Sequence, residues 1–147
     1  MTLKDQLNNA MKAAMKARDD LRLSAVRMVR SAIKNLEIDQ KKELDDQGVI
    51  SVISTLVKQR RESIRMYQEG NRPELAEKEE AELNILLDFL PTQMSLEEIE
   101  ELVSRIISET GAQGPKDMGR VMKAVTPLTA GKADGKAVSD IVRDRLA

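Results

Sequence analysis

Three observations predict an all-α fold for this sequence. Apolar residues recur at helical spacing, i, i+3, i+4 and i+7, along most of the 147 residues. No segment alternates β-branched and polar residues as a half-buried strand would, so no sheet is expected. Residues that cap or stop helices stand between the periodic segments. We expect an N-terminal module of four helices, residues 1–92, and a C-terminal module of three helices, residues 93–147.

Short polar side chains mark the beginnings of the first three helices. Thr2 is expected to cap the first helix, and Asp19 or Asp20 the second, because such side chains accept hydrogen bonds from first-turn N–H groups. The turn signal at residues 45–48 precedes a third helix, which is expected to end near Gly70.

A proline marks each end of the fourth helix. Asn71 is expected to cap this helix, and Pro73 is tolerated in its first turn. Pro91 ends it, because proline disfavours helical backbone at the residue before it. The stretch 90–94 therefore forms the boundary between the two modules.

Three further helices are expected beyond this boundary. Ser95 opens the fifth helix with a capping box, and Gly111 ends it. Pro115 opens the sixth helix, which Pro127 kinks or ends. Asp134 is expected to cap the seventh.

The composition excludes several classes of site. The chain has no cysteine and no histidine, which removes disulfides, thiolate nucleophiles, Cys-ligated zinc and the commonest general base. Tyr67 and Phe89 are the only aromatic residues, too few for a base-stacking platform. We predict no catalytic residue, no metal and no cofactor. The polar N-terminus and the lack of a long apolar run predict a cytoplasmic protein that does not enter a membrane.

Charge is distributed unevenly along the chain, although its net value is only −1. Residues 1–42 carry ten Lys and Arg against five Asp and Glu, a net charge of +5. Residues 74–110 carry two against eleven, a net charge of −9. Such basic and acidic blocks bear on the choice of partner more than the total does.

The acidic residues form two clusters, within 77–82 and 97–101. A carboxylate-bridged di-metal site would need histidines that the chain lacks. A magnesium site built from carboxylates and substrate phosphates stays open. The alternative is two solvated helix faces whose charge suits a helix N-terminus.

The stretch 131–136, Gly-Lys-Ala-Asp-Gly-Lys, has the composition of a phosphate loop but not its pattern. A phosphate loop needs a glycine five residues before the Gly-Lys pair, and a Ser or Thr directly after the lysine. This stretch has neither. Lys132 and Lys136 could still flank a helix N-terminus that binds one phosphate. The alternative is a capped turn between two helices.

Basic side chains share one face of the second helix. Arg27, Arg30, Lys34 and Lys41 project within about 60° of one another at 100° per residue. Such a face could follow a phosphate backbone, with Lys4, Lys12 and Lys16 of the first helix extending it. The alternative is an ordinary solvated face.

A second basic group occupies residues 58–61 of the third helix. Arg60 falls within the apolar stripe, so we expect it to snorkel or to pair with Glu79 or Glu82 of the fourth helix. Lys58 and Arg61 are expected to point outward, where they could meet a partner.

Gly119 lies within a strongly helical pattern, at a cost of about 1 kcal/mol relative to alanine. We expect the close approach of another helix, or of a ligand backbone, to compensate for this cost.

Several motifs together resemble the YqeY family. They are Leu23-Ser24-Ala25-Val26-Arg27-Met28-Val29, Lys58-Gln59-Arg60, Tyr67, Leu90-Pro91, Met94-Ser95, Asp117-Met118-Gly119-Arg120-Val121-Met122 and Gly131-Lys132-Ala133-Asp134-Gly135. The C-terminal part is also similar to the tail domain of the B subunit of the tRNA-dependent amidotransferase. Gly119 and Met122 match the helix motif of that tail domain, and Gly131 and Asp134 match its turn motif.

The resemblance implies an all-helical fold of four and then three helices, and it implies tRNA as a partner. In the amidotransferase, the tail domain helps to engage tRNA while other domains carry out amide transfer. The family-level activity would be a carbon–nitrogen ligase with glutamine as amido-N-donor.

We expect a tRNA-binding or amidotransferase-associated accessory module that is not catalytic by itself. The alternatives are a protein-interaction adaptor or a component of the ligase activity. The expected nucleic-acid contacts are Arg27, Arg30, Lys34, Lys58, Arg61, Lys132 and Lys136. The oligomeric state is left open.

Overall fold

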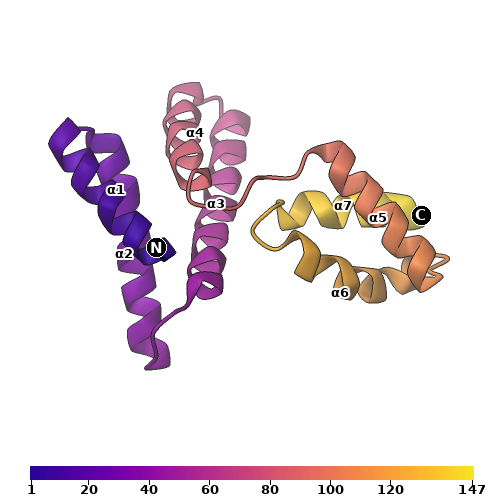
Figure 1. The fold of residues 1–147 in the computed structure, drawn as a ribbon. Helices are drawn as coiled ribbons and strands as arrows, with labels where there is room; N and C mark the ends of the chain where they lie inside the picture. The colour runs from indigo at the N-terminus through magenta and orange to yellow at the C-terminus, as the bar shows by residue number, and fades with distance from the viewer. The chain divides into compact units, whose positions relative to one another are not determined.

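The computed structural model describes residues 1–147 and contains helices but no strand, which confirms the all-α prediction. None of the helices combines the length and the apolar content needed to cross a bilayer. The α-helices are α1 (Leu3–Ala17), α2 (Asp20–Gln40), α3 (Asp46–Glu69), α4 (Pro73–Leu87), α5 (Leu96–Thr110), α6 (Met118–Thr129) and α7 (Gly135–Leu146) (Figure 1).

Contacts divide the chain into two compact units, Met1–Pro91 with α1 to α4 and Thr92–Ala147 with α5 to α7. Each unit has a hydrophobic core of its own. Compactness does not show that a segment folds alone. The proposed division into an independent four-helix module and three-helix module therefore stays a prediction.

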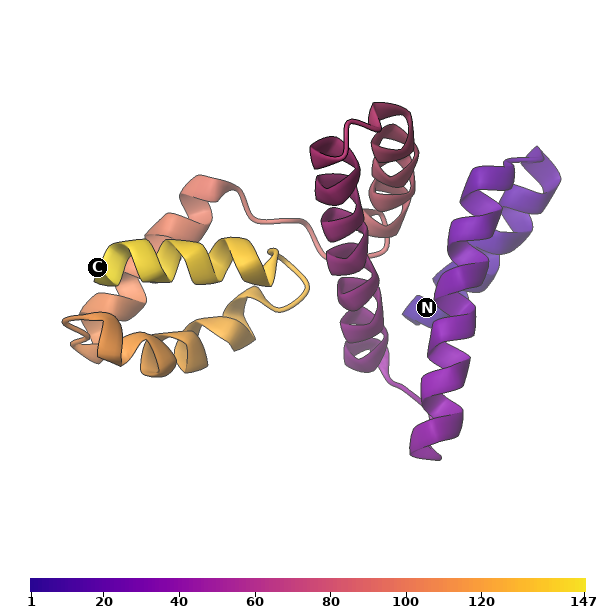
Figure 2. The ribbon, with the colours of Figure 1, turned by 180° about the vertical axis from the view of Figure 1, so that it is seen from behind.

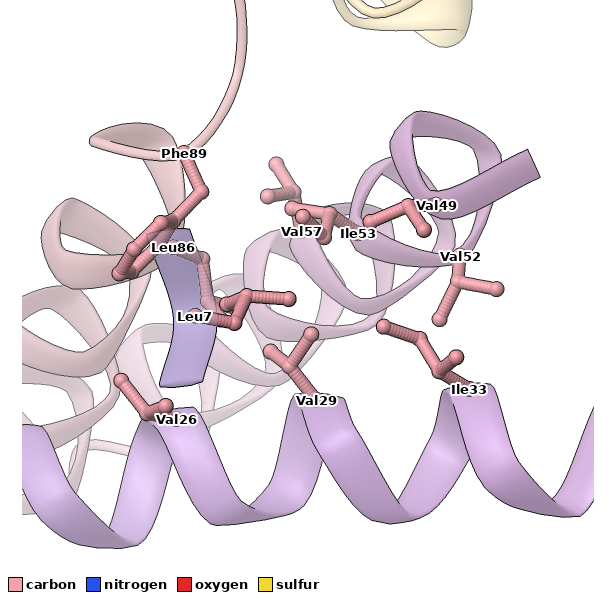
Figure 3. Close-up of a cluster of buried hydrophobic side chains, with 10 residues drawn as sticks. All are labelled: Leu7, Val26, Val29, Ile33, Val49, Val52, Ile53, Val57, Leu86 and Phe89. Atoms are coloured by element: carbon pink, nitrogen blue, oxygen red, sulfur yellow. The ribbon is translucent and has the colours of Figure 1, made fainter. Parts of the chain in front are cut away.

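The core of the first unit lies where α1, α2, α3 and α4 meet. Helix α1 packs on α2 and α3 packs on α4, as two antiparallel pairs (Figures 1 and 2). Val29 and Ile33 of α2 point toward side chains of α3 (Figure 3). The buried side chains are Leu7, Val26, Val29, Ile33, Val49, Val52, Ile53, Val57, Leu86 and Phe89.

Each of the three helices of the second unit packs against the other two. All three present an apolar stripe with helical spacing to a shared core. The buried side chains are Ile99, Val103 and Ile106 of α5, Val121 and Val125 of α6, and Val138, Val142 and Leu146 of α7.

Most predicted helix ends are confirmed. Thr2 accepts a hydrogen bond from the N–H of Asp5 at 3.1 Å in a complete capping box, and Asp19 caps α2. Ser95 opens α5 with a second capping box. Gly111 ends α5 with a φ of 69°, in the left-handed region that glycine adopts without steric cost.

One predicted cap is wrong, and another is right in position but lacks its side-chain hydrogen bond. Asn71 does not cap α4, because its own φ is 58° and it forms the left-handed turn between α3 and α4. Arg72 holds the cap position and makes no side-chain cap bond. Asp134 does precede α7, but its side chain makes no capping hydrogen bond.

Pro115 and Pro127 each match the prediction for α6 only in part. Pro115 opens a single 3-10 turn, Pro115–Asp117, and α6 follows from Met118. Pro127 does not end α6, which continues to Thr129. Since Pro127 and Lys123, the residue four positions before it, are both exposed, water can replace the missing N–H donor.

Candidate anion-binding groove

A groove of about 520 Å³ runs along α1 and α2, which lie side by side in Figures 1 and 2. Its floor includes two core side chains, and its walls carry charged and polar groups. The lining residues are Lys4, Leu7, Asn8, Arg27, Arg30, Ser31, Ile33, Lys34 and Glu37.

Helical spacing places the cations of α2 along this groove. Arg27, Arg30 and Lys34 are separated by three and four residues, so their side chains share one face. All three are exposed, whereas Val29 and Ile33 are buried in the core. Three of the four predicted members of the basic face therefore open onto the groove, whereas Lys41 lies beyond the end of α2 with a φ of 55° and does not line the groove. What this face binds stays a prediction.

Helix α1 contributes to the same groove through its first turns. Lys4 lines it as a fourth cation, together with the Asn8 amide. Arg30 reaches toward α1, with its Nη1 2.9 Å from the sulfur of Met11. Lys12 and Lys16 are exposed but do not line the groove, so the predicted extension of the basic face involves Lys4 alone.

One carboxylate, Glu37, lies among these cations. It forms an ion pair with Lys4, and its Oε2 accepts a hydrogen bond from the Leu44 N–H at 2.8 Å. These two interactions, with Lys4 first, hold the pKa of the Glu37 carboxyl below its usual value. Four cations and one carboxylate leave the groove an excess of three positive charges.

The chemistry of these groups suits the binding of phosphate oxygens. Arginine and lysine form charge-assisted hydrogen bonds with phosphate, and the Asn8 amide and the Ser31 hydroxyl add neutral donors. Phosphate contacts of this kind position a nucleic acid without reading its sequence.

Sequence reasoning missed three members of this groove, namely Asn8, Ser31 and Glu37. Their signal was their spacing, because Ser31 lies four residues after Arg27 and Glu37 lies three residues after Lys34. Asn8 could have been found only by knowing which face of α1 meets α2.

The two cations predicted to point outward from α3 differ in exposure. Lys58 is exposed, whereas Arg61 is half-buried. The prediction of an outward-pointing Arg61 is therefore wrong in part. Neither residue lines the groove.

Arg60 confirms the predicted pairing across the first unit. Its Nε lies 3.0 Å from Glu82 Oε2 and 3.2 Å from Glu79 Oε2, both on α4. Its Nη2 lies 2.9 Å from the sulfur of Met28. Two members of the acidic cluster at residues 77–82 therefore serve a structural ion pair.

The second acidic cluster borders a hollow of about 370 Å³ on the second unit, lined by Glu97, Glu100, Glu101, Ser104 and Arg145. No group of three acidic side chains anywhere in residues 1–147 is placed to hold a metal ion. The magnesium alternative gains no support from this arrangement.

The loop before α7 is held in place by one backbone and one side-chain donor of the second unit. The Met94 N–H donates to the Lys132 carbonyl at 2.8 Å, and the Gln93 amide donates to the Gly131 carbonyl at 2.8 Å. Gly131 has a φ of 74°, which favours glycine. Lys132 and Lys136 are both exposed beside the beginning of α7.

One of the two explanations predicted for Gly119, the close approach of another helix, is wrong, and the other, a ligand backbone, stays a prediction. It is exposed, and a Cβ placed on it would meet no atom within 4 Å, so no other helix of this chain approaches it closely. Gly119 is the second residue of α6, where the propensity cost is smaller than in a helix interior. Met122 is partly buried and packs on the core of the second unit.

A family model described as Yqey-like protein matches residues 4–146 of the chain. This protein belongs to the YqeY family. The match begins at Lys4 in the groove and runs to the last residue of α7, so both units of this Yqey-like protein lie within it.

Several curated relatives of this Yqey-like protein are named "Altered inheritance of mitochondria protein 41, mitochondrial". The relative from Lachancea thermotolerans is 38% identical over 112 residues, which cover 74% of this chain and 60% of the relative. The relative from Vanderwaltozyma polyspora is 39% identical, covering 70% and 57%. The relative from Kluyveromyces lactis is 38% identical, covering 74% and 60%. The chain thus spans somewhat more than half the length of each relative.

These relatives contradict the predicted cytoplasmic location, because each is named as a mitochondrial protein. The prediction relied on the absence of a long apolar run near the N-terminus. That criterion detects secretory signals and membrane spans, whereas mitochondrial targeting segments are amphipathic and rich in arginine and serine.

Proposed function

We propose that this Yqey-like protein is a non-catalytic accessory module that binds RNA through the groove between α1 and α2. The observation that carries the proposal is the convergence of Lys4, Arg27, Arg30 and Lys34 on one groove with an excess of three positive charges. A phosphate backbone is the polyanion that such a groove suits.

We propose tRNA as the RNA, on the resemblance of the C-terminal part to the amidotransferase tail domain. An association with an amidotransferase, in which other subunits perform the ligase chemistry, belongs to the same proposal. The mitochondrial relatives point to a mitochondrial location for such a role.

Further cations of α3 and of the second unit complete the proposed contact set. Lys58 and Arg61 of α3 lie outside the groove, and Lys132 and Lys136 stand beside the N-terminal end of α7. A helix N-terminus favours an anion through its free N–H groups and its dipole. Replacing Lys132 and Lys136 with alanine should weaken RNA binding if this second contact exists.

The decisive experiment is a titration of fluorescent tRNA with the purified full chain over a range of salt concentrations. Three cations of the groove have no carboxylate partner. We therefore expect the logarithm of the association constant for tRNA to fall with the logarithm of the salt concentration, with a slope of about −2 to −3. An unstructured RNA of equal length tests whether folded tRNA is preferred. Absence of salt-dependent binding to either RNA would refute the proposal and leave the protein-interaction adaptor as the leading function.

A further inference from the structure

A negatively charged side chain lies among the cations at one end of the groove. Glu37 is the one carboxylate among the lining residues, and it is paired with Lys4 rather than open to solvent. The Leu44 N–H, from the connection between α2 and α3, donates to the same oxygen and fixes the position of the carboxylate. Arg27, Arg30 and Lys34 form no ion pair with any carboxylate.

We propose that Glu37 is an intramolecular competitor of phosphate for Lys4, so that it lowers the affinity of the groove and selects long polyanions over single phosphates. The inference rests on the proposed RNA-binding function and adds to it a residue that regulates the same site.

The physical reason is the exchange that an incoming phosphate must make. A phosphate at Lys4 replaces a carboxylate that is already hydrogen-bonded, so this exchange brings little net gain. A single phosphate makes no other favourable contact at that end of the groove that could offset this exchange. A polyanion gains contacts at Arg27, Arg30 and Lys34 at the same time, and these contacts can offset the displacement of Glu37.

The test is the variant Glu37→Gln in the full chain. Glutamine keeps the size of the side chain and a carbonyl oxygen that can accept the Leu44 N–H, but it carries no charge to hold Lys4. We expect E37Q to bind tRNA about two- to fivefold more tightly at low salt, because no carboxylate then has to be displaced from Lys4.

Asp39→Asn provides the matched control. Asp39 is an exposed carboxylate on the same helix, two residues from Glu37, and it does not line the groove. Both variants remove one negative charge, so D39N measures the effect of net charge alone and should bind tRNA less tightly than E37Q. The double variant Lys4→Met/Glu37→Gln removes both members of the pair, and it should lose the gain in affinity that E37Q shows.

The unmodified protein provides a second measurement. A carboxyl-carbon NMR titration should find the Glu37 pKa below its usual value in the free protein, and tRNA should move this pKa upward as Lys4 transfers to phosphate. Inorganic phosphate at the same total phosphate concentration should leave it unchanged.

Two results would overturn the inference while leaving RNA binding intact. One is E37Q binding tRNA no more tightly than D39N, and the other is a Glu37 pKa that does not respond to bound tRNA. A parent protein that binds no RNA would refute the proposed function itself, which is a different outcome of the same titration.

Discussion

Arg60 of α3 places its Nε 3.0 Å from Oε2 of Glu82 on α4, with Glu79 on its other side at 3.2 Å. The three side chains retain between 16% and 20% of their exposure, so water screens them only in part. One arginine therefore joins two carboxylates across the most closely packed helix pair of the first unit.

Arg60→Ala should lower the free energy of unfolding by about 2–3 kcal/mol, because it leaves Glu79 and Glu82 side by side and partly desolvated. Urea denaturation followed by circular dichroism measures this. Arg65→Ala is the control, since Arg65 pairs with Glu62 and Glu69 on the surface and should cost under about 1 kcal/mol. Equal losses in the two variants would contradict a special role for Arg60.

Arg27→Ala/Arg30→Ala should weaken tRNA binding by about tenfold at low salt and reduce the magnitude of the salt slope by about 1.4–1.8. Both side chains are exposed, so the fold should persist. Fluorescence anisotropy at several salt concentrations checks the affinity and the slope.

Lys12→Ala/Lys16→Ala is the matched control for that double variant, because it removes two exposed cations of α1 that lie outside the groove. The salt slope of this control should change by less than half as much as the slope of the Arg27→Ala/Arg30→Ala variant. Identical losses would mean that overall charge, not the groove, determines the binding.

Gly119→Ala should raise the free energy of unfolding by about 0.5–1 kcal/mol. Gly119 has no positive φ and its missing Cβ would meet open space, so alanine restricts the unfolded chain without a clash. The same substitution at Gly111, where φ is 69°, should destabilise the protein by about 1 kcal/mol. Thermal unfolding of both variants measures these opposite changes in stability. Melting temperatures that shift in the same direction would disprove the prediction.

Asp117 should contribute to stability in a pH-dependent way. Its Oδ2 accepts a hydrogen bond from the Gln113 N–H at 2.9 Å, and that bond, with Arg120 and Lys116 nearby, holds its pKa below 3.8. A pKa lowered by folding stabilises the folded state above the unfolded value, and this contribution is lost as the pH falls below it.

Asp117→Asn should therefore destabilise the protein at pH 7, and its difference from the parent should shrink as the pH falls below about 3.8. Urea midpoints measured between neutral pH and pH 3 test this. A difference that stays constant over that range would argue against the charge of Asp117 as its source.

Local signals in the sequence predicted most helix ends because each depends on neighbours within one turn. The capping boxes at Thr2 and Ser95, and the left-handed Gly111, are of this kind. The wrong cap at Asn71 and the continuation of α6 past Pro127 have a shared cause. Both residues have an alternative that the sequence does not exclude, a left-handed turn for asparagine and an exposed last turn for proline.

Only some residues of the groove were predicted, because local spacing determines some of its members and helix packing determines the others. The spacing of Arg27, Arg30 and Lys34 places them on one face of a helix whatever that helix packs against. Which residues of α1 stand opposite that face depends on how two helices cross, so Lys4 was found without its partner Glu37.

The sequence by itself determined the helical class, the apolar stripe of each helix and the clustering of basic residues on α2, because helical periodicity and capping are local properties. Only the tertiary structure decided that Lys4 and Glu37 meet, that Arg61 is half-buried and that Gly119 is open. Such contacts join residues that are far apart in the chain or lie on different helices, and the packing of one helix on another determines them.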